Sequence, residues 1–185
     1  MIVFLLEERS MKEVLDIILP RLLPEGTDFI TIPHNGKSDL EQSIPRKLKA
    51  WRQPNTKFVI VRDQDSADCI KVKKHLKDIV EPYGREVLIR IACKELEAWY
   101  FGDLNAVSKA YGYSLESLAN KRQYRDPDKI ENPKAELKRL LPLHQQLEGA
   151  RNIAIHMDIC NNTSSSFNQF VLGVRKFVCG RPYHE

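Results

Sequence analysis

Long hydrophobic runs are absent from this sequence, and no apolar stretch approaches the roughly 20 residues that a membrane-spanning helix requires. Residues 1–10, MIVFLLEERS, are apolar only briefly and carry neither a basic leader nor a small-residue cleavage site. We therefore interpret them as a buried strand rather than a signal peptide. The 185 residues, of which 42% are hydrophobic, suffice for one domain with a substantial core.

Closely spaced cysteines are also missing. The four cysteines, Cys69, Cys93, Cys160 and Cys179, lie far apart and form no C-x-x-C pair. This spacing argues against a zinc knuckle and against a redox motif. We therefore expect reduced thiols in a cytoplasmic protein.

Several widespread catalytic motifs do not occur. The chain has no Rossmann glycine fingerprint, no Gly-x-Ser-x-Gly elbow and no H-E-x-x-H, which removes nicotinamide-binding, α/β-hydrolase and zincin interpretations. A strong charge of one sign is missing too, since the net charge is +4 and the isoelectric point is near 8.8. This mildly basic balance permits contact with nucleic acid without requiring it, because lysine and arginine also simply solvate helix faces.

The sequence does contain an alternation of apolar strands and amphipathic helices. Helical spacing follows SMKE (10–13), which has the form of a capping box, and recurs from Ser38 or Asp39 to about Trp51 and over 67–80. This alternation predicts an α/β fold with a mostly parallel, four-stranded sheet flanked by helices. The predicted strands are 2–6, 28–32, 57–61 and 86–93.

The remainder of the chain is mainly helical in pattern. We expect a single domain over 1–185 that consists of an α/β core (1–97), a helical extension packed on the sheet (98–179) and a tail (180–185). The polar, proline-containing segment 122–134 is predicted to be a loop. Helical patterns cover 94–103, 103–112, 134–143 and 166–178.

Acidic residues follow two of the predicted strands. Glu7 and Glu8 come after the first strand, and Asp63 and Asp65 come after the third. Ligands of parallel sheets bind beyond the carboxyl ends of the strands, and paired carboxylates suit a hard cation such as Mg²⁺. In an extended chain, D-x-D would also place both carboxylates on one side. The alternatives are an Asx-turn or a helix cap for D-x-D, and an ordinary loop start for the two glutamates.

Further candidates lie near these ends. Glu95 and Glu97 follow the fourth strand, where at most one of them faces the acids if the segment is helical, and an ordinary salt bridge is the alternative. The remaining candidates are basic groups that would hold phosphates of a nucleic acid or neutralise the carboxylates. They are His34, Lys37, Arg62 and Arg90.

A glutamate after the first strand and D-x-D after the third resemble the TOPRIM domain of topoisomerases, primases and overcoming-lysogenization-defect nucleases. Further segments from residue 2 to about 178 resemble the bacterial TOPRIM-like family known as domain of unknown function 4276. These segments are FLLEERSMKE, IPHNGKSDLEQSIPRKLKAW, FVIVRDQDSADC, RIACKELEAWYFGD, NPK and SSSFNQFV. The resemblance implies a TOPRIM-like Rossmannoid fold.

The resemblance also implies roles. Glu7, Asp63 and Asp65 take the places of the TOPRIM metal ligands, Glu97 is a further ligand of Mg²⁺ or Mn²⁺, and Lys134 contacts a phosphate or the transition state. Glu8 stands where TOPRIM first strands usually carry glycine. The implied activity is metal-dependent phosphodiester hydrolysis of DNA or RNA, together with an ATPase partner in phage defence.

Two alternatives to the nuclease remain open. In the first, the chain is a TOPRIM-like module that keeps the fold and binds nucleic acid or a protein without cutting. The second alternative, a receiver-type phosphoacceptor with Asp63 as the acceptor, ranks last because Lys94 is a poor match for the lysine that such domains need.

Overall fold

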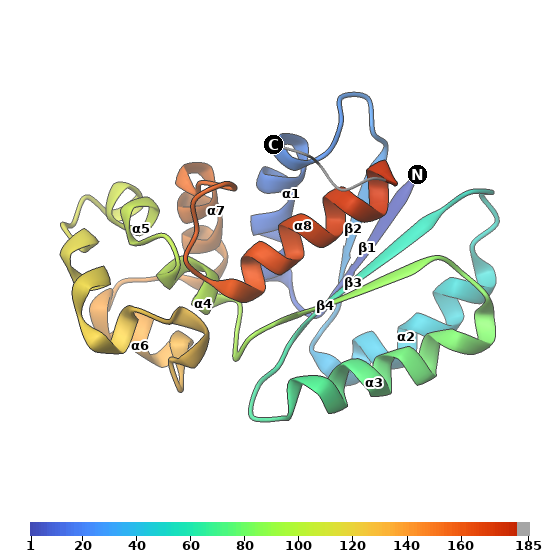
Figure 1. Cartoon of the computed structure of the whole chain (residues 1–185), viewed down its shortest axis with the longest axis horizontal. Helices are drawn as coiled ribbons and strands as arrows, with labels where there is room; N and C mark the ends of the chain where they lie inside the picture. The colour runs from blue at the N-terminus through green and yellow to red at the C-terminus, as the bar shows by residue number, and fades with distance from the viewer. Residues whose placement is uncertain (181–185) are drawn as a thin grey trace.

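A four-stranded, all-parallel sheet forms the centre of the computed structural model, which describes residues 1–180 (Figure 1). The strand order is β2-β1-β3-β4, so β2 and β4 are the edges. The predicted α/β class and the parallel sheet are confirmed. The strands are β1 (Ile2–Leu6), β2 (Phe29–Pro33), β3 (Lys57–Asp63) and β4 (Val87–Ala92).

Helices cover both faces of the sheet (Figure 1). α1 (Arg9–Leu22) and α8 (Ser165–Cys179) lie on one face, and α2 (Lys37–Ala50) and α3 (Cys69–Val80) lie on the other. The central strand β1 is therefore buried on both sides, which explains why its sequence IVFLL is uniformly apolar instead of alternating.

The connections that follow the two central strands, β1 and β3, leave on opposite faces of the sheet. β1 connects through α1 on one face to β2, whereas β3 connects through α3 on the other face to β4. Two neighbouring strands whose connections leave in opposite directions form a topological switch point, and open α/β sheets bind ligands in the crevice there. The topology therefore leads us to expect a ligand site beyond the carboxyl ends of β1 and β3.

The helical extension gathers beyond these carboxyl ends (Figure 1). Its side chains join the core of the α1/α8 face, where Trp99 is fully buried and lies against the rings of Phe167 and Phe170. Removal of such a side chain typically costs about 3–5 kcal/mol. The extension comprises α4 (Glu97–Phe101), α5 (Leu104–Tyr111), α6 (Pro133–Leu140) and α7 (Gln146–His156).

Several local predictions need correction. Ser10 does not cap α1, because the helix begins at Arg9 and the Ser10 hydroxyl donates to Glu8 Oε1 at 2.5 Å. The N-cap of α2 is Gly36, so neither Ser38 nor Asp39 serves there. α7 was not predicted at all. Short 3-10 helices are η1 (Glu81–Tyr83), η2 (Glu116–Asn120), η3 (Arg122–Tyr124) and η4 (Pro127–Lys129), and the last two lie in the expected loop.

The described part of the chain contains no helix that is long and apolar enough to cross a membrane. Most of the expected tail, residues 181–185, lies outside the described residues.

Candidate functional site

Two carboxylates meet at the switch point. β1 and β3 pair in parallel with Leu6 opposite Val61, so the residues that follow, Glu7 and Asp63, lie at the same edge of the sheet. The Asp63 amide donates a hydrogen bond to Glu7 Oε2 at 3.0 Å. Both residues are buried, with 8% and 7% of their surfaces exposed. Strand register therefore brings together two acids that lie 56 positions apart in the chain.

Asp63 is the least satisfied group of this region. Its Oδ1 is buried and has no hydrogen-bond partner among the described residues. Burial raises the pKa of Asp63 well above its usual value, and the charges of Glu7 and Glu97 raise it further. An ionised Asp63 therefore needs a cation that these residues do not provide.

Glu97 joins the two strand-end acids from α4. Its side chain is 2% exposed, because the neighbouring aromatic residues of EAWYF are themselves buried. Burial raises the pKa of Glu97 to about 7 despite the nearby Lys134 ammonium, which acts in the opposite direction. Tyr100, one turn later, is also buried, and its phenol pKa is raised by burial and then by Glu97. We call Glu7, Asp63 and Glu97 the carboxylate crevice.

Arg62 neutralises the negative charge of the crevice only partly. Its Nη1 donates to Glu41 Oε1 on α2 at 2.6 Å, whereas its Nε lies 3.8 Å from Glu7 Oε2 and has no hydrogen-bond partner in residues 1–180. Burial outweighs this distant positive charge and raises the pKa of Glu7 to about 7. The predicted neutralising role of Arg62 therefore extends mainly to Glu41.

Asp65 does not continue the strand. β3 ends at Asp63, and Asp65 adopts a left-handed backbone (φ 56°) in which its amide donates to the Lys94 carbonyl at 2.7 Å. Lys94 is left-handed as well, with φ 60°. The expected extended alternation of D-x-D is thus wrong. Such conformations cost on the order of 1–3 kcal/mol each for residues other than glycine and cluster at functional sites.

The Asp65 carboxylate has a cation beside it. Lys37 Nζ lies 3.2 Å from Asp65 Oδ2, so the predicted phosphate-binding lysine is paired across two loops. The alternative role of D-x-D as a helix cap is not observed, because a different aspartate caps the next helix. Asp68 caps α3, and its Oδ1 accepts a hydrogen bond from the Lys71 amide at 2.9 Å.

His34 is held by the fold. Its Nδ1 contacts the Leu6 carbonyl at 2.8 Å, and its Nε2 contacts the Ser43 hydroxyl. Burial lowers the pKa of His34, which favours the neutral ring. With both ring nitrogens engaged, His34 fixes the loop after β2 in this structure and does not offer a nitrogen to a ligand.

Two neighbouring cavities open next to the crevice. One of about 560 Å³ is lined by Glu97, Lys134, Lys138, His144 and Gln146, among others. The second, of about 490 Å³, is lined by residues that include Asp65 and Lys94, and both cavities share Glu95 and Asn132. Lys138 lies in a predicted helix but had no motif that marked it, whereas His144 and Gln146 were missed because α7 was not predicted.

Lys134 lies at the start of α6, close to Glu95 and Glu97. Its amide donates to Glu95 Oε2 at 2.9 Å, near the start of α6. Its ammonium is close enough to Glu97 to lower the pKa of that carboxyl. Lys134 thus lies between the crevice and the larger cavity. Arg90, in contrast, lies within β4 and lines a different cavity, away from the carboxylates.

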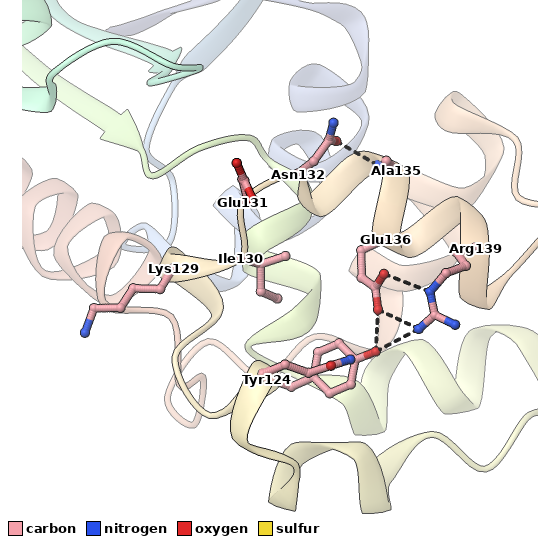
Figure 2. A pocket seen from close by; sticks show the side chains of 9 residues that line it. Tyr124, Lys129, Ile130, Glu131, Asn132, Ala135, Glu136 and Arg139 are labelled. Carbon is pink, nitrogen blue, oxygen red and sulfur yellow. Dashed lines mark hydrogen bonds and ion pairs between the residues drawn. The ribbon is translucent and has the colours of Figure 1, made fainter.

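A further cavity, of about 480 Å³, contains a carboxylate that is paired with an arginine of the same cavity wall (Figure 2). Arg139 donates to both carboxylate oxygens of Glu136, at 2.7 and 2.9 Å, and the Tyr124 hydroxyl donates to the same carboxylate. The Arg139 hydrogen bonds lower the pKa of Glu136 to about 2. We call these three residues the paired cluster.

The crevice has the donor chemistry of a Mg²⁺ site. Buried carboxylate oxygens are the ligands that Mg²⁺ prefers, and the unpartnered Asp63 Oδ1 is a free donor. Among residues 1–180, no three histidine, cysteine or acidic side chains are already arranged as metal ligands. The residue types therefore fit a hard divalent cation, and its full ligand set requires side-chain movement.

Comparison with known proteins places the chain at the family level. No curated protein and no solved structure matches it. One family model, described as Domain of unknown function (DUF4276), matches residues 6–175, which include the three acids of the crevice, strands β2 to β4 and most of α8. The chain therefore belongs to the DUF4276 family.

Proposed function

We propose that this protein is a TOPRIM-like, Mg²⁺- or Mn²⁺-dependent nuclease that hydrolyses phosphodiester bonds of DNA or RNA. One observation carries the proposal: Asp63 is a buried carboxylate with an unpartnered oxygen, placed beside Glu7 and Glu97 at the switch point of the sheet. Strongly perturbed acids in a crevice are typical of functional sites. The sequence resemblance to TOPRIM domains supports the choice of chemistry.

The proposed ligands are Glu7, Asp63 and Glu97, with Asp65 joining them when its contact with Lys37 is released. A bound divalent ion supplies Lewis-acid polarisation of a phosphoryl oxygen and stabilisation of the leaving oxygen. Lys134 contacts a phosphate of the substrate in the adjoining cavity.

An ATPase partner and a role in phage defence complete this proposal and rest on the sequence resemblance.

A module that binds nucleic acid or protein without cutting is the second candidate. It is favoured by the cations already placed near two acids, Arg62 near Glu7 and Lys37 near Asp65. Glu8 also departs from the TOPRIM glycine, and its carboxylate accepts hydrogen bonds from Gln146 Nε2 at 3.1 and 3.2 Å.

The test combines calorimetry with Mg²⁺ and Mn²⁺ and cleavage of plasmid DNA and RNA on the same samples. The variants are Asp63→Ala, Asp63→Ala/Asp65→Ala and, as the matched control, Asp78→Ala on the exposed side of α3. The nuclease proposal expects metal binding and cleavage in the wild type and the control, and neither in the crevice variants. Metal binding without cleavage would indicate that cleavage needs the proposed partner, and the assay is then repeated with a candidate ATPase. Absence of metal binding overturns the nuclease and leaves the binding module.

A further inference from the structure

A small cavity of about 220 Å³ lies along β4, the outer strand of the sheet, away from the carboxylate crevice. Side chains from three elements line it: Lys73 of α3, Arg90 of β4, and Ser165 and Gln169 of α8. Two thiols, Cys69 and Cys93, and the carboxylate of Asp128 complete its wall. We call this the edge cavity.

The edge cavity holds two cations without a matching anion. Arg90 Nε is buried and has no hydrogen-bond partner in the described chain, and Arg90 Nη1 makes only a long contact of 3.4 Å with the Ile89 carbonyl. Neither Arg90 nor Lys73 has a carboxylate within ion-pairing distance among residues 1–180. Burial lowers the pKa of Lys73, and the charge of Arg90 lowers it further, so the two cations are close enough to repel each other.

The one carboxylate in the cavity wall already accepts hydrogen bonds from other groups. Asp128 accepts hydrogen bonds from the Ser164 hydroxyl at 2.7 Å and from the Ser166 amide and hydroxyl at 2.7 and 3.0 Å. These bonds fix the Asp128 carboxylate at the start of α8. Its charge is therefore used to secure the helix end rather than to pair with Arg90.

The backbone of α8 is adapted to the guanidinium. A Cβ atom at Gly173 would lie 1.9 Å from Arg90 Nη2 and 2.3 Å from Nε, so only glycine permits this close passage. The arginine side chain is thus positioned by packing between β4 and α8 while its Nε lacks a partner. Arg90 is half-buried, and its buried Nε without a hydrogen-bond partner is unfavourable unless an anion binds to it.

We propose that the edge cavity binds a phosphate group through Arg90 and Lys73. A planar guanidinium matches the oxygens of a tetrahedral oxyanion, an ammonium adds charge, and Ser165 and Gln169 offer further polar contacts. The volume admits a phosphate with a few waters, since each water occupies about 30 Å³ in the liquid. The site goes beyond the proposed nuclease activity and does not depend on it.

The cysteines provide a local test in the unmodified protein. Cys69 and Cys93 line the cavity, whereas Cys160 and Cys179 are exposed elsewhere. The rate of iodoacetamide labelling is measured at each cysteine by peptide mass spectrometry, with inorganic phosphate or with chloride at equal ionic strength. Phosphate should slow labelling of Cys69 by about tenfold at ten times its dissociation constant, following simple binding linkage. Cys93 reacts slowly in either buffer, because burial raises the pKa of its thiol to about 11.

Variants establish which groups bind. Arg90→Met and Lys73→Met should each abolish the protection of Cys69, and Lys74→Met, an exposed lysine on the same helix, should leave it unchanged. Gly173→Ala displaces the guanidinium without changing its charge and should also abolish protection. Circular dichroism identifies any variant that fails to fold; Lys73→Met removes only a half-buried side chain and carries the test in that case.

The source of the phosphate is decided by a second arm. A short single-stranded oligonucleotide without terminal phosphates replaces inorganic phosphate in the same labelling assay. Stronger protection by the oligonucleotide assigns the site to a backbone phosphate, and protection by inorganic phosphate alone assigns it to a small ligand. The proposal fails if phosphate protects none of the cysteines or all of them equally. It also fails if Lys74→Met removes protection as fully as Lys73→Met.

Discussion

The carboxylate crevice and the paired cluster contain the same kind of group in opposite states. In the paired cluster, the Glu136 carboxylate accepts two hydrogen bonds from Arg139, and its pKa falls to about 2. In the crevice, burial raises the pKa of Glu7 and of Glu97 to about 7. The pKa of a carboxylate thus falls where a cation is hydrogen-bonded to it and rises where it is buried without one.

The two regions also differ in how they are assembled. Glu136 and Arg139 lie three positions apart on α6, so one helical turn brings them together. Glu7, Asp63 and Glu97 come from β1, β3 and α4 and meet only when the sheet has formed. Residues that are close in sequence form their ion pairs within one helix. Carboxylates that are brought together by tertiary structure can remain without a hydrogen-bond partner where a ligand is to bind.

The sharpest test of this contrast is catalytic. Asp63→Asn should reduce Mg²⁺-dependent cleavage by about 100-fold or more, because an amide is a poor ligand for a hard cation. Glu136→Gln should retain full cleavage, since its carboxylate belongs to a structural pair. Initial rates of cleavage of a fluorescent oligonucleotide measure both effects. Equal losses of cleavage in the two variants would show that the difference between the crevice and the paired cluster is unrelated to function.

The pH dependence of stability should differ in sign between the two regions. Glu97 has a pKa near 4.5 when unfolded and about 7 when folded, so the folded state holds a proton in between. Its stabilising contribution is full below pH 4.5 and is lost as the pH rises through 7. The loss is on the order of 3–4 kcal/mol, because the pKa rises from 4.5 to about 7 and each pKa unit corresponds to about 1.4 kcal/mol.

Urea unfolding between pH 5.5 and 8.5, with EDTA present, measures this loss. Glu97→Gln should make the decline smaller, with the remainder due to Glu7 and Asp63, and added Mg²⁺ should stabilise the wild type more at high pH than at low pH. Glu136 acts in the opposite sense: its contribution is full above pH 4.5 and is lost as the pH falls toward 2. A wild-type curve that is flat from pH 5.5 to 8.5 would contradict the raised pKa values.

Disrupting the paired cluster should have a smaller effect. Glu136→Gln removes one partner of a pair that solvent partly screens, so we expect a loss of at most about 1 kcal/mol that shrinks in high salt. Urea unfolding at low and high ionic strength measures it. A loss of several kcal/mol that is independent of salt would place this pair among the buried interactions instead.

The left-handed residues allow the smallest and most local test. Lys94→Gly and Asn55→Gly both relieve a positive φ, of 60° and 54°, and each should raise stability by about 0.5–1 kcal/mol. Only the Lys94 variant should weaken cleavage, because glycine loosens the backbone whose carbonyl accepts the hydrogen bond from the Asp65 amide beside the crevice. Loss of cleavage in the Asn55 variant as well would point to a general effect on the fold.

Much of the fold could be predicted because its signals are local. Buried central strands require uninterrupted apolar runs, so all four strands were found close to their observed bounds. α7 escaped prediction because its sequence, QLEGARNIAIH, has weak amphipathicity and a central Gly149. A Cβ at Gly149 would lie 2.2 Å from the His144 ring, so that glycine reflects a tertiary contact that no local pattern reveals.

The candidate site was predicted in part for the same reason. Glu7 and Asp63 could be named because each ends an apolar strand, and parallel strands bring such ends together. Asp65 was misplaced because the left-handed turn after β3 depends on its hydrogen bond with Lys94 from a neighbouring loop. Arg90 was misplaced because its strand-end position was judged without knowing that α8 would cover β4.

By itself, the sequence determined the four strands and most of the helices, though not α7, and showed that acids follow β1 and β3. Only the tertiary structure decided which of those acids remain unpaired. Arg62 is drawn to Glu41 and Lys37 to Asp65, which leaves Asp63 Oδ1 buried without a partner. The physical reason is that pairing depends on distances across the strand order and between loops, which are defined only when residues far apart in the chain pack together.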